Sequence, residues 1–314
     1  MHFLAKATVV LSLTTQVLCW GDVGHRTVGY LAKKYLTDSA NQLFEKILEN
    51  PNGWDFSDAA TWADTVKRSR PYTSSWHFVD ARDSPPTLCG LHYPDDCSAQ
   101  GTNGCIITAI NNQTSLFLSP DSSKIVVKEA LMYLMHFIGD LHQPLHVEDK
   151  ARGGNEIKPV QFGTSHTQNL HSVWDTAIPH KMRGLSGTLS DVEERTAAVE
   201  WADELFETNA ARGVTVESEC SDVAIPDKCA LEWANKSNEW ICKYVLKKSE
   251  EWLEKRGNDL AKGYYEGAKP IVDELIGLAG ARLGAWMNAM AAVVLEREDG
   301  EWEKTLLGEG RVDL

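Results

Sequence analysis

The sequence predicts an all-α fold: a single, mainly helical domain with one loop-rich face. After Trp20 the apolar residues recur mainly at helical spacing, and Glu156–Phe162 is expected as a short strand or hairpin arm. The chain carries no internal repeat, low-complexity tract or clear linker. Residues 20–314 are therefore expected to form one large domain around a single core.

Most of the chain is expected to be helical, apart from one long connection. Residues 80–122 contain several Pro, Gly and Cys and are expected to form a long loop held by disulfides. The helices expected, in chain order, are Arg26–Leu36, Asp38–Glu49, Ser123–Gln143, Asp191–Ala211, Cys229–Lys255 and Lys262–Glu296.

Ser123–Gln143 is apolar nearly all round, which is typical of a central buried helix. Ionisable residues on such a helix need partners, so His136 and Asp140 are expected to be paired or metal-bound. Pro144 cannot donate a backbone hydrogen bond, and its ring clashes with the carbonyl of residue 140. The helix is therefore expected to end or kink near Gln143.

Residues 1–19 are expected to be a secretory signal peptide. Lys6 makes the start weakly positive, Ala7–Leu18 is mostly apolar, and Val17 and Cys19 stand third and first before a cleavage site at Trp20. This apolar stretch is too short to span a bilayer, and no later segment is expected to span one. The mature protein is expected to be a secreted, extracellular monomer.

The cysteine count agrees with secretion. Six cysteines remain once Cys19 leaves, and an even number in an oxidising compartment predicts disulfides, which could pair in many ways. Asn112 and Asn235 stand in glycosylation acceptor sequences. The favoured pairing has two local loops, Cys97–Cys105 and Cys220–Cys229, and one distant bridge, Cys89–Cys242.

Two His–Asp pairs, His136/Asp140 and His171/Asp175, carry the clearest chemical signal. Each pair is four residues apart, so on a helix both side chains point from one face. An imidazole nitrogen presented with a carboxylate oxygen suits zinc. One such pair is also common as a surface hydrogen bond, but two pairs together with His146 predict a multinuclear zinc site. His142 stands only two residues from Asp140 and is expected to be structural or to support a ligand.

Further candidates lie upstream. Asp64 and His77 would each, taken alone, more often be a helix cap or an ordinary hydrogen-bonding residue. At the mature terminus, the α-amino nitrogen and carbonyl oxygen of Trp20 can chelate an ion in a five-membered ring, and His25 can add a nitrogen. The alternative reading of these residues is a frayed terminus.

The formal net charge is −14, which is the wrong sign for a protein that binds nucleic acid through Lys and Arg. Bound zinc would reverse the local balance, because metal ions can replace basic residues at a phosphate. An acidic surface also suits a protein that works at low pH.

Several motifs together resemble those of the single-strand-specific, zinc-dependent nucleases of fungi and plants. They are WGDVGH, ATWADTVK, WHFVDARD, HFIGDLHQPLHV, GGN and NLHSVWD, in the same order and spacing over nearly the whole mature chain. The fold and metal chemistry of that family are shared with bacterial zinc phospholipase C. The resemblance implies three Zn²⁺: the first held by Asp64, His77, His136 and Asp140, the second by His146, His171 and Asp175, and the third by Trp20 and His25, with Asp140 shared between the first and third.

The resemblance also implies a mechanism. A water attacks phosphorus in line, and Asp64 accepts or orients its proton. The family often has Arg three residues later; here Lys67, followed by Arg68, supplies charge without the bidentate fork.

A nucleobase pocket is implied as well, formed by Phe78, Asp80, Gly154 and Asn155. Stacking on an aromatic ring tolerates any base and requires an unstacked nucleotide. This predicts a preference for single strands without sequence readout.

The expected activity is that of a secreted endonuclease and 3′-nucleotidase. Its substrates would be single-stranded DNA and RNA and 3′-mononucleotides, and its products would be 5′-phosphorylated. One alternative is a zinc phospholipase C that cleaves a lipid phosphodiester. Another is a secreted, non-catalytic zinc-binding or adhesive protein, which would have to lack Asp64.

Overall fold

The computed structural model describes residues 20–49, 55–98, 101–215 and 219–297, and the predicted signal peptide lies outside them. The described residues are mainly helical, which confirms the all-α prediction. The helices are α1 (Asp22–Lys34), α2 (Asp38–Leu48), α3 (Phe56–Val66), α4 (Asp95–Ser98), α5 (Ile106–Leu118), α6 (Lys124–Asp140), α7 (Leu170–Ser172), α8 (Ile178–Met182), α9 (Asp191–Ala211), α10 (Pro226–Trp240), α11 (Glu250–Glu254) and α12 (Gly263–Leu295).

Short turns and one hairpin connect these helices. Strands β1 (Val160–Phe162) and β2 (Ser165–Gln168) pair antiparallel, which confirms the strand expected near the end of Glu156–Phe162. The turns are η1 (Pro71–His77), η2 (Gly101–Asn103) and η3 (Pro144–Val147), which are 3-10 helices, and η4 (Val173–Ala177) and η6 (Ile241–Val245), which are π-helical.

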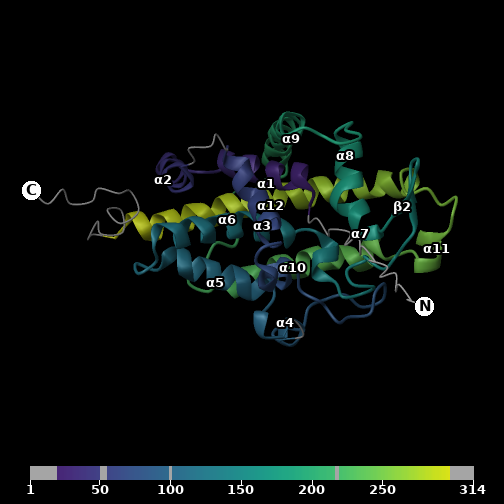
Figure 1. Cartoon of the computed structure of the whole chain (residues 1–314), viewed down its shortest axis with the longest axis horizontal. Coiled ribbons are helices and arrows are strands. Elements are labelled where there is room, and N and C mark those ends of the chain that lie inside the picture. Colours follow the sequence, from purple (N-terminus) through teal and green to yellow (C-terminus); the bar gives the residue numbers. More distant parts are fainter. Residues whose placement is uncertain (1–19, 50–54, 99–100, 216–218, 298–314) are drawn as a thin grey trace, which may run out of the picture.

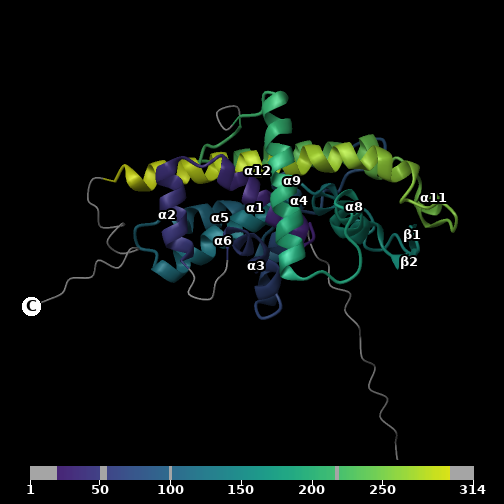
Figure 2. The same cartoon turned by 90° about the horizontal axis from the view of Figure 1, so that it is seen from above.

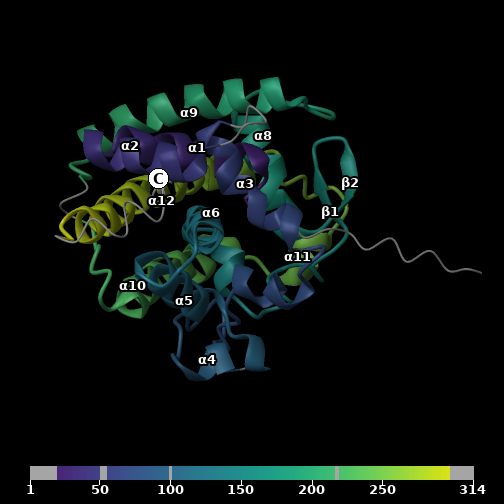
Figure 3. The ribbon, with the colours of Figure 1, turned by 60° about the vertical axis from the view of Figure 1, so that its left-hand side comes forward.

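Helix α12 runs along the length of the molecule, and α9 crosses over it (Figures 1 and 2). Helix α1 packs against both of them. On the other side of α1, the helices follow one another as α3, α6, α5 and α10, each in contact with the next (Figure 3). The predicted central helix is therefore central: all residues from Ala130 to Asp140 on α6 are buried.

Helix α12 is long and apolar enough to cross a membrane by length and composition, contrary to the expectation from the sequence. Of its most apolar 18-residue window, 67% is buried inside the protein. Those residues pack against other helices, as in the core helix of a globular domain.

The long loop predicted over residues 80–122 is partly wrong. Its second half forms α5, a helix of 13 residues. Ile106, Ile110 and Phe117 recur at helical spacing and are fully buried against α6 and its neighbours. The Pro, Gly and Cys that suggested a loop are concentrated before Ile106.

The single helix predicted over Cys229–Lys255 is also wrong. Helix α10 ends at Trp240, a π turn follows, and α11 begins only at Glu250. The Ser249 hydroxyl accepts a hydrogen bond from the Trp252 N–H and caps the new helix, which the apolar spacing alone does not reveal.

The three disulfides pair as favoured from the sequence: Cys89–Cys242, Cys97–Cys105 and Cys220–Cys229. Cys89–Cys242 joins residues 153 apart in the sequence, and so fixes the loop after residue 80 to the turn that follows α10.

Candidate metal centre

The predicted ligands converge from separate elements. His25 lies on α1, Asp64 on α3, His77 at the end of η1, and His136 and Asp140 on α6. Helix α6 ends at Asp140, earlier than the predicted Gln143, and the chain turns at Pro144 into η3. That turn directs His146 back toward the cluster, as expected, and His171 and Asp175 follow on α7 and η4.

Asp64, His77, His136 and Asp140 form the first group. His77 Nδ1 lies 3.0 Å from Asp140 Oδ2 and 3.1 Å from His136 Nε2, and the latter is 3.2 Å from Asp140 Oδ2. Asp64 Oδ1 lies 3.7 Å from His77 Nδ1 and 3.7 Å from His136 Nε2. Donors on a tetrahedron around zinc stand about 3.3 Å apart, given bonds of about 2.0 Å. The spacing of His77, His136 and Asp140 fits one zinc ion, and Asp64 forms a further group with His25 and His136.

His146, His171 and Asp175 form the second group. His171 Nε2 is 3.1 Å from Asp175 Oδ2, and His146 Nε2 is 3.9 Å from Asp175 Oδ1. The Gln143 amide donates a hydrogen bond of 2.5 Å to Asp175 Oδ1, which fixes that carboxylate in place.

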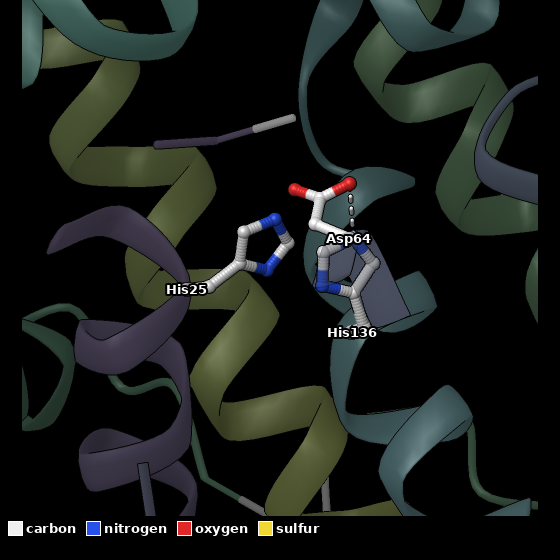
Figure 4. Close-up of side chains that lie close together, drawn as sticks. All are labelled: His25, Asp64 and His136. Carbon is white, nitrogen blue, oxygen red and sulfur yellow. Dashed lines mark ion pairs between the residues drawn. The ribbon is translucent and has the colours of Figure 1, made fainter. Parts of the chain in front are cut away.

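His25 extends the first group on the side of α1. Its Nε2 lies 3.2 Å from Asp140 Oδ1, while Asp140 Oδ2 faces His77 and His136. The carboxylate therefore presents one oxygen to each side. Figure 4 shows His25 and His136 with Asp64 above them, and the two imidazoles are stacked with centroids 3.9 Å apart.

Trp20 lies in the same region and is fully buried. Its neighbour Gly21 donates a backbone hydrogen bond of 2.8 Å to the Asp175 carbonyl, and α1 then leads directly to His25. Coordination through the amino nitrogen and carbonyl oxygen of Trp20 stays a prediction.

Backbone carbonyls fix the orientation of three histidines. The Nδ1–H groups of His136, His146 and His171 donate to the carbonyls of Ala60, His77 and Gly153 at 2.6, 2.7 and 2.6 Å. Each Nε2 is thereby left as the ligand nitrogen, which is the arrangement seen in most metal-binding histidines.

Several of the inward-facing atoms are buried and make no hydrogen bond. They include His25 Nε2, Asp140 Oδ1, His146 Nε2, His171 Nε2 and Asp175 Oδ2. Burying polar atoms without hydrogen-bond partners destabilises the folded protein, and the buried carboxylates of Asp140 and Asp175 need positive charge nearby. Nitrogen and carboxylate donors at this spacing fit zinc. Three such groups can be distinguished: His25, Asp64 and His136; His77, His136 and Asp140; and His146, His171 and Asp175, of which the first two share His136.

Asp64 is held in its ionised form. Burial opposes ionisation, but the charges of His136 and Lys67 outweigh it and hold the pKa of the Asp64 carboxyl well below its usual value. The Lys67 ammonium lies 2.7 Å from Asp64 Oδ1, whereas Arg68 is exposed. Lys67 is therefore a basic residue in direct contact with Asp64.

His142 lies outside the groups of predicted ligands, in agreement with its expected structural role. Its Nδ1–H donates to the Ile138 carbonyl, and its Nε2 accepts from Arg282 at 2.8 Å. Burial, with the nearby Arg282 charge, holds the pKa of His142 well below its usual value, so the ring is neutral.

The predicted base-pocket residues follow the metal ligands along the chain. Val79 N–H donates to the His146 carbonyl, and Asp149 N–H to the Ala81 carbonyl, so the segment with Phe78 and Asp80 runs beside the one that leads to Gly154 and Asn155. Phe78, Asp80 and Asn155 are half-buried, and Gly154 is buried. Gly154 has a φ of +72°, a turn conformation that favours glycine.

Gln143 is the supporting residue that the sequence did not reveal. Its hydrogen bond reaches Asp175 across 32 positions, so no local spacing could indicate it. The same is true of the carbonyls of Ala60 and Gly153, since any residue supplies a carbonyl.

The sequence pattern of the S1/P1 Nuclease family matches residues 20–292. Nuclease S1 of Aspergillus oryzae is 34% identical over 298 residues, which cover 93% of this chain and 98% of that protein. Nuclease P1 of Penicillium citrinum is 35% identical over 275 residues, covering 86% and 97%. Endonuclease 4 of Arabidopsis thaliana is 29% identical over 303 residues, covering 91% and 94%.

Proposed function

Because the chain belongs to the S1/P1 nuclease family, we propose that it hydrolyses single-stranded DNA and RNA, without sequence specificity, to 5′-phosphorylated products. We further propose that it removes phosphate from 3′-mononucleotides. The observation that carries this proposal is the buried set of imidazole and carboxylate atoms that converge without hydrogen-bond partners.

Three zinc ions are proposed to bind here. The proposed ligands are Asp64, His77, His136 and Asp140 for the first ion, His146, His171 and Asp175 for the second, and Trp20 and His25, with Asp140, for the third. Bound zinc would supply positive charge for the phosphate and lower the pKa of a water molecule.

Asp64 is proposed to accept or orient the proton of the attacking water. Its lowered pKa keeps the carboxylate ionised, so that it can accept a hydrogen bond from water and orient it. The Lys67 ammonium lies 2.7 Å from Asp64 Oδ1, and we propose that it adds positive charge beside the phosphate.

Single-strand preference is proposed to come from Phe78, Asp80, Gly154 and Asn155. A half-buried ring at Phe78 offers a stacking face, and the carboxylate and amide offer hydrogen bonds to a base edge. In a duplex the faces of each base are already stacked and its edge is already paired, so a duplex base cannot make these contacts.

The chain is proposed to be secreted after removal of residues 1–19, and to act as a monomeric domain over residues 20–314 without a membrane anchor. Three disulfides support an oxidising compartment. Of the proposed glycosylation acceptors, Asn112 is exposed on α5. The Asn235 amide is bound to the Leu91 N–H and the Leu231 carbonyl, so Asn112 is the better acceptor.

The test is hydrolysis of single-stranded DNA, double-stranded DNA, RNA, 3′-AMP and phosphatidylcholine, each with and without EDTA. We expect cleavage of the single strands and of 3′-AMP, and loss of both in EDTA. Asp64→Asn should lower turnover by roughly two to four orders of magnitude while the fold survives. Phosphatidylcholine turnover without DNA cleavage would favour the phospholipase alternative instead.

A further inference from the structure

A cavity outside the metal centre combines lysines with aromatic rings. It has a volume of about 360 Å³ and lies between the end of η6, helix α11 and the start of α12. Figure 1 shows these elements at the end of the molecule where β2 lies. Its walls include Tyr244, Lys247, Lys248, Trp252, Lys262 and Tyr264.

The cavity is positively charged although the chain as a whole is acidic. Lys247, Lys248 and Lys262 are all exposed at its rim. In its one acidic lining residue, Asp259, Oδ1 accepts hydrogen bonds from the backbone N–H groups of Gly163 and Ala261 at 2.7 and 3.0 Å, and Oδ2 lies 3.9 Å from the Lys262 ammonium. Three ammonium groups outnumber the single carboxylate, and Lys262 is the one that lies beside it, so the rim carries a net positive charge that favours anions.

A second cavity shows that this charge is specific to the first. It has a similar volume of about 380 Å³ and is lined by Trp76 and Tyr93, but the described residues around it include no Lys or Arg. Both cavities have aromatic walls, so the feature that distinguishes the lysine-lined cavity from the second one is its positive charge.

The aromatic walls are held rigidly. Tyr264 is buried and donates a hydrogen bond to the Val245 carbonyl at 3.0 Å, and Tyr244 donates to the Tyr264 carbonyl. Trp252 is half-buried, and the Lys248 ammonium lies 5.2 Å from the centre of its ring. The phosphate of a nucleotide whose base stacks on Trp252 would therefore lie close to Lys248.

The cavity is connected to the metal centre through few residues. Trp174, next to the proposed ligand Asp175, donates a hydrogen bond of 2.9 Å to the Tyr264 hydroxyl. Helix α11 is joined to the segment that carries Gly154 and Asn155 by an ion pair of 3.0 Å between Lys150 and Glu250. These two contacts connect the walls of the cavity to the segments that carry Asp175 and Asn155.

We propose that the lysine-lined cavity is an auxiliary binding site for a second nucleotide of the same single strand. Lys247, Lys248 and Lys262 bind its phosphates, and Trp252 stacks on its base. This inference rests on the proposed nuclease function. It assigns the cavity to substrate affinity and leaves the chemical step to the metal centre.

The test compares a long substrate with one too short to reach the cavity. In Trp252→Ala and in the double variant Lys247→Ala/Lys248→Ala, KM for single-stranded DNA of about twelve nucleotides should rise roughly tenfold. Values of kcat for this DNA, and kcat/KM for a dinucleotide, should stay unchanged. The slope of log affinity against log salt should fall by roughly one in the lysine variant.

The matched control is Lys228→Ala/Lys236→Ala, which removes the same charge from exposed positions on α10. An equal rise in KM in the control, no rise in the cavity variants, or an equal loss on the dinucleotide would each overturn the inference. Equilibrium binding of a phosphorothioate oligonucleotide separates the two proposals. A parent enzyme that cleaves neither substrate contradicts the nuclease function, whereas this binding measurement still decides the role of the cavity.

Discussion

The Asp140 carboxylate organises the metal centre at the level of single residues. One oxygen faces His25 and the other faces His77 and His136. Burial opposes its ionisation, but His136 and His146 hold the pKa of Asp140 well below its usual value. The residue thus remains an anion between two groups of neutral or cationic donors.

Gln143 should matter for metal affinity although it is not a proposed ligand. In Gln143→Ala the amide that fixes Asp175 Oδ1 is lost, and zinc at the second group should bind roughly 10- to 100-fold more weakly. Competition with a chelator measures this affinity. Gln113→Ala, which removes another buried glutamine, should leave it unchanged. Equal affinities in the parent and Gln143→Ala would show that Asp175 needs no such support.

Gly139 allows His25 to lie against α6. A Cβ at this position would stand 2.9 Å from His25 Nδ1, so Gly139→Ala should displace the imidazole. We expect about one zinc ion fewer by metal analysis, while helicity is preserved because alanine is the better helix former. At Gly263 a Cβ meets nothing within 4 Å, so Gly263→Ala is the control. Full zinc content in Gly139→Ala would show that His25 is not a ligand.

Between elements, Asp58 ties α3 to α1 and α9. It accepts hydrogen bonds from Arg26 at 2.6 Å and from Arg195 at 2.8 Å. Burial opposes its ionisation, but the two guanidinium groups outweigh it and lower the pKa of Asp58. The folded pKa lies below the unfolded value, so this stabilisation is present above the unfolded pKa and is lost as pH falls through the folded one.

Asp58→Asn should therefore destabilise the protein by about 2 kcal/mol near pH 7. The difference from the parent should shrink as pH falls below about 4. Urea unfolding at several pH values measures it. Asp203→Asn breaks an exposed ion pair with Lys34 and should cost less than about 1 kcal/mol. A difference for Asp58→Asn that does not change with pH would mean that the charge of Asp58 is not what stabilises the contact.

Part of the proposed ligand set could be predicted from local spacing, whereas Asp64 and His77 were proposed through the family resemblance and some helices were missed. The four-residue spacing of His136 and Asp140 on an apolar helix indicates a shared site, and Pro144 predicts the turn that directs His146 toward it. Helix α3, which carries Asp64, was not expected, because its short apolar stretch gives no long periodic signal. Its start depends on Asp55 and Asp58, whose reciprocal capping contacts only the structure displays.

At the scale of the whole molecule, metal binding should be coupled to stability. The proposed ligands come from α1, α3, η1, α6, η3, α7 and η4, so zinc joins elements that lie far apart in the sequence. EDTA should lower the melting temperature and abolish activity together, and added zinc should restore both. Magnesium should restore neither, since it prefers all-oxygen octahedral sites. Full activity in EDTA with magnesium would contradict the zinc assignment.

The packing of α1 against α12 has a consequence for the order in which the protein is made. Every proposed ligand precedes residue 176, but α12, one of the helices that pack against α1, begins only at Gly263. A growing chain therefore contains all of its proposed metal-binding side chains before it contains the whole of the packing around His25. The packing around α1 is complete only after synthesis has reached the last helix.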